Sequence, residues 1–172
     1  MRSPPANPIL LVEDNDIHAA FFTVALRRHP ELHLSRVCDG LEAQDYLLGV
    51  GRYANRSVHP LPVAMIVDLL MPRCDGAELL SWMRSRPECA HLPAVMISSS
   101  IFQEDMDRSY AAGAQAFFVK PSTPMGFQHL LDCLLKYWTD GGLLSLPTEP
   151  SGETGTVPAT ATRAARSGTR AR

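Results

Sequence analysis

Short apolar runs that end at a polar or charged residue recur along the first 120 residues of the chain. They cover residues 9–12, 63–67, 94–97 and 116–119, and the residues that follow them are Glu13, Asp68, Ser98 and Lys120. An uninterrupted apolar run is typical of a parallel strand that is covered on both faces. With a further strand expected over residues 32–37, the pattern predicts five strands.

Helical spacing of apolar residues predicts helices between these strands. Asn15 is suited to cap the first helix, in which Ile17, Phe21 and Val24 recur at helical spacing before the chain reaches Pro30. The last helix is predicted by apolar residues at i, i+3, i+4, i+7, i+8 and i+11, which are Phe127, Leu130, Leu131, Leu134, Leu135 and Trp138.

Three further helices complete the alternation. They are expected over residues 41–50, after the turn at Asp75-Gly76, and over residues 103–112. Between the first of these and the next strand, residues 51–62 form a loop that is longer than is usual. Because parallel strands need crossover connections, the order predicts a doubly wound α/β domain with helices on both faces of the sheet.

Composition separates one folded domain from a tail. We expect an N-terminal extension over residues 1–7, the folded domain over residues 8–140, and a disordered tail over residues 141–172 that is rich in Pro, Gly, Thr and Arg. The tail carries four arginines, but a solvated segment is a simpler interpretation than a nucleic-acid contact. No second folded module is expected.

Charge and cysteine usage exclude several classes of function. A net charge of −2 gives no reason to bind nucleic acid or an anionic membrane. The four cysteines lie far apart, which favours free thiols in a reducing cytosol over disulfides or a zinc site. No run approaches the ~18 apolar residues of a membrane span, so the protein is expected to be soluble and cytoplasmic.

The candidate chemistry lies where the strands end, because ligands bind at the carboxyl ends of the strands in an open parallel sheet. This topology brings together Glu13, Asp14, Asp68, Ser98 and Lys120. Clustered carboxylates either raise a pKa or hold a cation, and ligands that are all oxygens favour Mg²⁺. A carboxylate can also act as a nucleophile toward a phosphoryl group.

Taken one at a time, these residues have simpler interpretations. Glu13 or Asp14 could be a helix cap or a solvated loop charge, Ser98 a loop hydroxyl, and Lys120 a surface lysine. Lys120 is, however, one of only two lysines in a chain with fourteen arginines. The hypothesis rests on the joint placement of the residues.

The sequence resembles the bacterial receiver-domain family over residues 8–138. The matching motifs are ILLVEDN at 9–15, MIVDLLMP at 65–72, DG at 75–76, Ser98 thirty positions after Asp68, and KP at 120–121. The resemblance implies a flavodoxin-like sheet with strand order 2-1-3-4-5. It also implies that Asp68 accepts a phosphoryl group from a histidine kinase, with Mg²⁺ held by Glu13, Asp14, Asp68 and the backbone carbonyl of Leu70.

The same resemblance assigns the switch residues. Ser98 is expected to bond the phosphoryl group, Phe117 to swing inward behind it, and Lys120 to contact the phosphoryl oxygens. The surface formed by the fourth helix, fifth strand and fifth helix would then signal to a downstream protein target or a phosphotransfer protein. The chain is expected not to be an enzyme, beyond slow self-catalysed phosphotransfer and dephosphorylation.

The long loop and the stretch RSYAAGA at 108–114 are similar to single-domain receivers that work with bacteriophytochrome kinases. This resemblance implies a homodimer, for which Phe102, Met106, Tyr110 and Phe118 could supply apolar contacts. The alternative is that most of these four are core residues.

Position 70, two residues after the phosphoacceptor, departs from many relatives because it is Leu rather than a polar residue. We predict that Leu70 hinders the attacking water and lengthens the phosphorylated lifetime. The same residue argues against a haloacid-dehalogenase phosphatase, which needs a second Asp there. A phosphorylation-independent, receiver-like interaction module is a further alternative, and nucleotide binding lacks a G-x-G-x-x-G or Walker-type loop.

Overall fold

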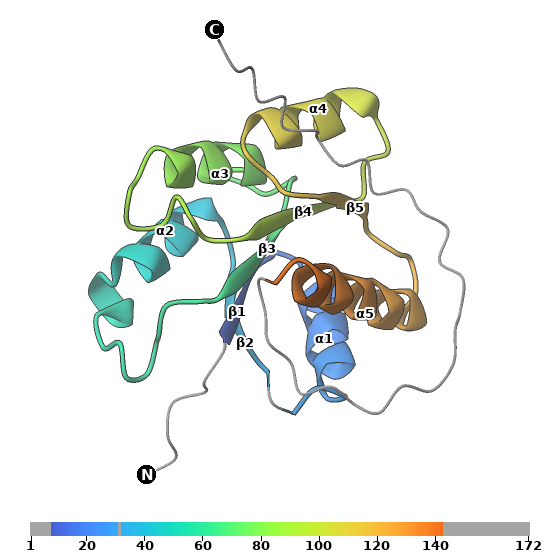
Figure 1. Cartoon of the computed structure of the whole chain (residues 1–172), viewed down its shortest axis with the longest axis horizontal. Helices are drawn as coiled ribbons and strands as arrows, with labels where there is room; N and C mark the ends of the chain where they lie inside the picture. Colours follow the sequence, from blue (N-terminus) through green and yellow to red (C-terminus); the bar gives the residue numbers. More distant parts are fainter. Residues whose placement is uncertain (1–7, 31, 143–172) are drawn as a thin grey trace, which may run out of the picture.

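The computed structural model describes residues 8–30 and 32–142, which fold around a five-stranded parallel sheet in the order β2-β1-β3-β4-β5 (Figure 1). This confirms the predicted doubly wound α/β fold. The elements are β1 (Pro8–Val12), α1 (Asp16–Leu26), β2 (His33–Val37), α2 (Gly40–Leu48), the 3-10 helix η1 (Gly51–Tyr53), β3 (Ala64–Asp68), α3 (Gly76–Arg84), β4 (Ala94–Ser98), α4 (Gln103–Ala111), β5 (Phe117–Val119) and α5 (Pro124–Asp140).

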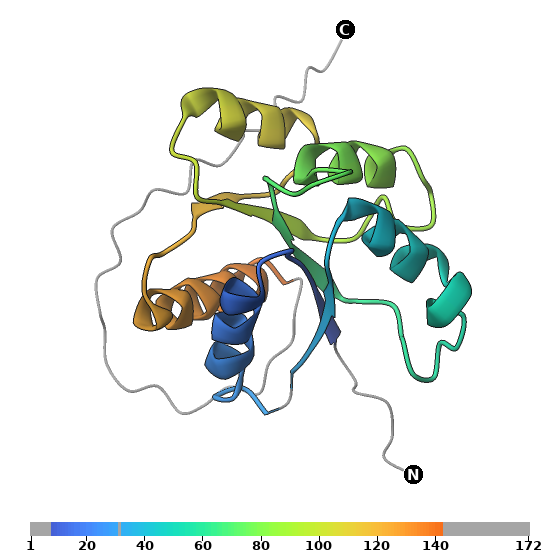
Figure 2. The ribbon, with the colours of Figure 1, turned by 180° about the vertical axis from the view of Figure 1, so that it is seen from behind.

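Two helix layers cover the sheet, with α1 and α5 on one face and α2, α3 and α4 on the other (Figures 1 and 2). Successive residues of the buried strands point to alternate faces. Leu10, Val12 and Met65 therefore join the core under α2, α3 and α4, whereas Ile9 and Leu11 join the core under α1 and α5. Every residue of β1, β3 and β4 is buried, which explains their uninterrupted apolar runs.

Most of the predicted helix signals are confirmed. Asn15 caps α1 by accepting hydrogen bonds from the backbone N–H groups of Ile17 and His18. Asp75 caps α3 in a capping box with Glu78. The six apolar residues predicted for the last helix are all buried on α5.

The apolar residues whose spacing predicted the first helix are not the residues that this helix buries. Ile17 and Val24 are 63% and 52% exposed. The residues that α1 buries are Ala19, Phe22, Ala25 and Leu26. Ile17 and Val24 therefore lie on the outer side of α1. Phe21, between them, is partly buried and its ring centroid lies 5.2 Å from that of Phe127. The three residues form an apolar stripe that is exposed at Ile17 and Val24.

The long loop between α2 and β3 is organised by an arginine. Arg56 donates hydrogen bonds to the backbone carbonyls of Tyr46 (2.7 Å), Leu47 (2.7 Å) and His59 (3.2 Å). Tyr53 packs its ring against Tyr46 with centroids 5.0 Å apart. These contacts fasten the loop to the end of α2, at the opposite end of the sheet from the strand ends that carry the candidate chemistry.

The predicted extension over residues 1–7, and all but the first two residues of the predicted tail, lie outside the described residues. All four cysteines are free thiols, as expected. Among the helices that the structure describes, none has both the length and the apolar character needed to cross a bilayer.

Candidate functional site

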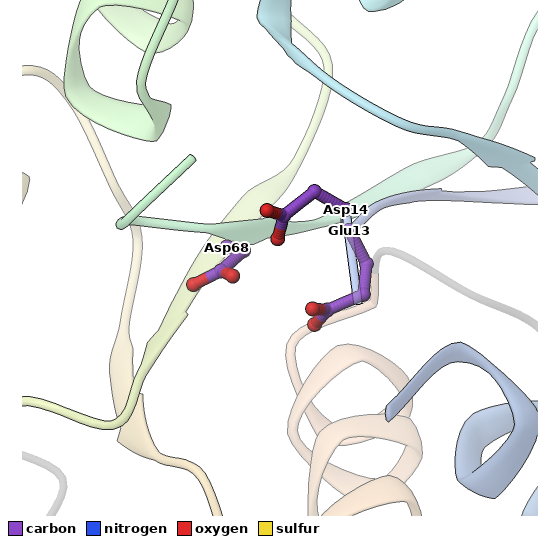
Figure 3. Close-up of side chains that lie close together, drawn as sticks. All are labelled: Glu13, Asp14 and Asp68. Atoms are coloured by element: carbon purple, nitrogen blue, oxygen red, sulfur yellow. The ribbon is translucent and has the colours of Figure 1, made fainter. Parts of the chain in front are cut away.

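Three carboxylates predicted to converge do so at the carboxyl edge of the sheet (Figure 3). Glu13 and Asp14 directly follow β1, and Asp68 is the last residue of the neighbouring strand β3. Each offers an oxygen, and these oxygens lie within 4.8 Å of one another. Glu13 and Asp68 are buried, whereas Asp14 is exposed, so the cluster is open to solvent on one side.

Lys120 completes the cluster from β5. Its ammonium lies 2.6 Å from Oδ2 of Asp68 and 2.8 Å from Oε2 of Glu13. The Lys120 backbone N–H donates to the carbonyl of Ser98 at 2.7 Å, which extends the pairing of β5 with β4 and fixes the root of the side chain. A buried lysine is therefore held between two buried acids, and its charge offsets part of their repulsion.

The environment of Asp68 raises the pKa of its carboxyl from 3.8 to about 6. Burial is the main cause, because it penalises the charged form. The hydrogen bond and the positive charge of Lys120 oppose the shift, and the charge of Glu13 adds to it. The backbone N–H of Leu70 also donates to Asp68 Oδ1 at 3.2 Å. Further positive charge at this edge would therefore favour ionised Asp68.

The donor set fits a divalent cation that prefers oxygen ligands. Glu13, Asp14 and Asp68 supply only carboxylate oxygens, and the ammonium of Lys120 already lies against two of them as a cation. Hard cations such as Mg²⁺ favour such oxygen sites. Leu70 lies in the same small open pocket of about 160 Å³, whose lining is Glu13, Asp14, Asn15, His18, Asp68, Leu70, Ser99 and Lys120.

The other two residues assigned to the switch, Ser98 and Phe117, lie on the neighbouring strands β4 and β5. Ser98 is fully buried at the end of β4, and its Oγ accepts a hydrogen bond from the backbone N–H of Ser100 at 3.0 Å. Phe117 pairs with Met96 across β4 and β5 and is already buried in the core under α2, α3 and α4. Their movement on phosphorylation stays a prediction.

His18 belongs to the site but was not predicted. Its Nδ1 lies 3.4 Å from both Glu13 Oε1 and Lys120 Nζ, and its ring stacks on Phe127 with centroids 5.5 Å apart. A lysine can only donate, so Nδ1 is suited to accept from Lys120. The only sequence signal is its position in the first turn of the helix that follows Asp14.

Two arginines brace the loops around the site, and neither was predicted. Arg36 of β2 contacts the turn that carries Glu13 and Asp14. Arg73, in the loop after Asp68, has a φ of 69° and forms an ion pair with the buried carboxylate of Asp39. A positive φ is unfavourable for a side chain such as arginine, so the ion pair helps to hold this conformation.

Comparisons with known proteins show what the whole folded domain is similar to. A family model described as the response regulator receiver domain matches residues 9–132. Response regulator Rcp1 of Synechocystis is 27% identical over 140 residues, which cover 81% of this chain and 93% of Rcp1. A solved structure of Mn²⁺-bound Rcp1 matches 83% of this chain and 99% of its own, with a TM-score of 0.71 and 25% identity.

Two other solved structures are similar. The phosphorylated cyanobacterial phytochrome response regulator RcpA matches with a TM-score of 0.72 and 29% identity, over 83% of this chain and 99% of its own. The bacteriophytochrome response regulator AtBRR matches with a TM-score of 0.69 and 33% identity, over 86% of this chain and all of its own. These relatives therefore include several response regulators associated with phytochromes.

Proposed function

Because the chain belongs to the response regulator receiver domain family, we propose that it is a phosphorylation switch in which Asp68 accepts a phosphoryl group from a histidine kinase. The observation that carries the proposal is the meeting of Asp68 with two further carboxylates and the ammonium of Lys120 at one open pocket. This combination supplies a nucleophile, ligands for a cation and a positive charge for the incoming phosphoryl oxygens.

In the proposed reaction an oxygen of Asp68 attacks the phosphorus of a phosphohistidine. The phosphorus–nitrogen bond breaks, the imidazole leaves with its electron pair, and an acyl phosphate forms on Asp68. Glu13, Asp14, Asp68 and the backbone carbonyl of Leu70 would hold Mg²⁺, which would supply positive charge to offset the negative charge of the transferred group. Lys120 then exchanges its contact with the Asp68 carboxylate for the phosphoryl oxygens.

Two relatives support parts of this proposal. RcpA is phosphorylated in its solved structure, and Rcp1 binds Mn²⁺ in its own, which supports a divalent cation as the partner of this chain's acidic cluster. The phytochrome-associated relatives favour a bacteriophytochrome as the kinase. We propose that the chain has no substrate turnover beyond its own phosphorylation and dephosphorylation, and that it acts on a downstream protein or phosphotransfer protein.

The apolar stripe on α1, which is exposed at Ile17 and Val24, is where we propose that the kinase docks. Ile17, Phe21 and Val24 lie one helical turn apart along the helix. The same helix starts at the pocket, because Asn15 and His18 line it. A protein that covers the stripe therefore lies beside Asp68, and apolar burial on α1 would hold a phosphohistidine near the nucleophile.

We propose that α4, β5 and α5 form the output surface and the homodimer contact. Of the four apolar residues considered for it, Phe102 is the most available, because its side chain is 71% exposed. Met106 and Tyr110 are partly buried against the core beside α3, and Phe118 packs against the core on the α5 side. The contact thus depends mainly on Phe102.

The experiment that tests the switch is intact-mass spectrometry after incubation with Mg²⁺ and acetyl phosphate. A hydroxylamine-labile phosphoryl adduct on wild type, absent from Asp68→Asn, is the expected result. An adduct on both proteins would place the phosphoacceptor elsewhere. If neither protein gains an adduct from acetyl phosphate or from an autophosphorylated kinase, the phosphorylation-independent interaction module is favoured.

A further inference from the structure

Arg36 fastens the turn that carries two of the three clustered acids. Its Nε donates to the backbone carbonyl of Glu13 at 3.0 Å, and its Nη2 donates to the carbonyl of Asp14 at 3.1 Å. The remaining nitrogen, Nη1, lies 2.7 Å from Oδ1 of Asp16, the first residue of α1. One guanidinium therefore contacts positions 13, 14 and 16, from the end of β1 to the start of α1.

The sheet fixes the backbone position from which the Arg36 side chain extends. Arg36 pairs with Leu11 in the ladder between β1 and β2, and the backbone N–H of Glu13 donates to the carbonyl of Val37 at 3.0 Å. The arginine thus rises from a fixed strand position next to the turn that it binds. Its planar fork suits simultaneous contacts of this kind, which a lysine ammonium on a flexible stem cannot reproduce.

Two other arginines of the described chain bind backbone carbonyls in the same way, but far from the acids. Arg56 bonds the end of α2 and the following loop. Arg84 bonds the carbonyls of Ala90, Leu92 and Gly113. Only the carbonyls bound by Arg36 belong to residues whose side chains are in the acidic cluster.

We propose that Arg36 is a positioning residue for the divalent cation site. The inference rests on the proposed function, since it assigns Arg36 to the cation that the switch needs. Glu13, Asp14 and Asp68 repel one another, and Asp14 is exposed and free to turn away. Arg36 fixes the peptide groups from which Glu13 and Asp14 extend, so their carboxylates stay aimed at a common point before the cation arrives. Partners that orient ligands in this way matter nearly as much as the ligands.

The direction in which Arg36 variants change the affinity for Mg²⁺ distinguishes a positioning role from a simple effect of charge. Arg36 is a cation beside a cation site, so its charge alone opposes Mg²⁺ binding. On that account Arg36→Met would bind Mg²⁺ more tightly and Arg36→Lys would bind it like wild type. Positioning predicts the opposite, that both variants bind Mg²⁺ more weakly, because neither side chain can hold both carbonyls and Asp16.

The test is isothermal titration calorimetry of the full chain with MgCl₂ near pH 7.5. We expect Arg36→Met and Arg36→Lys each to raise the Kd for Mg²⁺ by about tenfold. Arg56→Met is the matched control, because it removes an arginine that also makes three contacts, all of them to backbone carbonyls, at the other end of the molecule. It should lower stability to urea while leaving the Kd unchanged.

Three outcomes would overturn the inference. Unchanged or tighter binding by both Arg36 variants overturns the positioning role alone, and so does equal weakening in Arg56→Met. A wild-type chain that binds no Mg²⁺ overturns the proposed function together with this inference. If Arg36→Met does not fold, Arg36→Lys decides the question, because it keeps the charge and the aliphatic stem on β2.

Discussion

The ammonium of Lys120 lies 2.6 Å from Oδ2 of Asp68, in the same cluster of acids that a divalent cation would enter. It also contacts Glu13 at 2.8 Å. In the absence of metal, Lys120 is therefore the cation that makes two buried carboxylates tolerable. A divalent cation bound at this cluster would take over part of this charge compensation and would leave the ammonium available to an arriving phosphoryl group.

We predict that Lys120→Met destabilises the metal-free protein at pH 7.5 by about 3 kcal/mol, because it leaves two buried acids without a partner. The pKa of Asp68 should rise further, since the hydrogen bond and charge of Lys120 hold it down. Urea unfolding with EDTA and with Mg²⁺ tests this prediction. Mg²⁺ should restore much of the loss, because it binds only the folded site.

Lys136→Met is the control for this experiment. Lys136 is the only other lysine of the chain and is exposed on α5, so its loss should leave both unfolding curves close to wild type. Equal effects of the two substitutions would contradict a specific role of Lys120 at the acids.

The raised pKa of Asp68 predicts a pH-dependent stability. Because folding raises this pKa from 3.8 to about 6, the ionised carboxylate opposes folding. The favourable contribution of the neutral form is complete below pH 3.8 and is lost as the pH rises through about 6. In EDTA at pH 7.5, Asp68→Asn should therefore be more stable than wild type by on the order of 3 kcal/mol.

The stability gain of Asp68→Asn should fall below about 1 kcal/mol near pH 4, because there the wild-type carboxyl is almost fully protonated in the folded state and nearly half protonated in the unfolded state. Urea unfolding at pH 4 and 7.5 measures the difference. A stability gain in Asp68→Asn that is the same at both pH values would mean that packing, rather than titration of Asp68, is responsible.

The fold could be predicted because β1, β3 and β4 are buried on both faces and therefore appear as mainly apolar runs. The side of α1 that packs against the sheet could not be predicted. Ile17, Phe21 and Val24 have helical spacing. Ala19, Phe22 and Ala25 have helical spacing too, on a neighbouring side of the same helix. Because α1 is apolar around most of its circumference, periodicity alone does not choose which stripe meets the sheet. That choice is made by the packing of α1 against α5 and β2.

The site was predictable as far as it depends on topology. Glu13, Asp68 and Lys120 meet because the strands that end in them are parallel members of one sheet. His18 and Arg36 were missed because their contacts depend on side-chain reach between elements, and no motif marks a histidine or arginine that does this. Arg36 in particular is indistinguishable in sequence from a solvated arginine on an edge strand.

Leu70 predicts a long-lived phosphorylated state. Its side chain is 54% exposed in the lining of the pocket that contains Asp68, so it covers the approach to the acyl phosphate with an apolar surface. We expect Leu70→Asn to shorten the half-life of the phosphorylated protein severalfold, because an amide can orient the attacking water. Decay of the phosphoprotein on phosphate-affinity gels measures this half-life, with Leu70→Met as the apolar control. An unchanged rate in Leu70→Asn would contradict the prediction.

A substitution of Phe102 tests whether the proposed output surface forms a homodimer. It stands just before α4 and is the N-cap residue of that helix without a side-chain capping bond, so its replacement costs the helix no cap. If α4, β5 and α5 form a homodimer, Phe102→Glu should raise the dimer dissociation constant about tenfold or more, because it places charge in an apolar contact. Sedimentation with and without acetyl phosphate measures this constant. A dimer equally stable in Phe102→Glu would have to form through another face.

If a histidine kinase docks on the stripe of α1, a substitution in the stripe should slow phosphotransfer from the kinase but not from acetyl phosphate. Val24→Asp adds a charge to an apolar surface that is already 52% exposed, so the fold should tolerate it while a protein that docks on α1 should not. We expect a large loss in kcat/KM for phosphotransfer from an autophosphorylated histidine kinase that acts on wild type. Acetyl phosphate is too small to need the stripe, so its rate should be unchanged.

Val58→Asp is the matched control, because Val58 is a similarly exposed valine, at 62%, in the loop after α2. This substitution should leave the rates of phosphotransfer from the kinase and from acetyl phosphate unchanged. If Val24→Asp instead slows both donors equally, the substitution has disturbed the turn at Asn15 and His18 rather than a docking surface. If it slows neither, the kinase reaches Asp68 without α1, and the outer stripe of this helix needs another explanation.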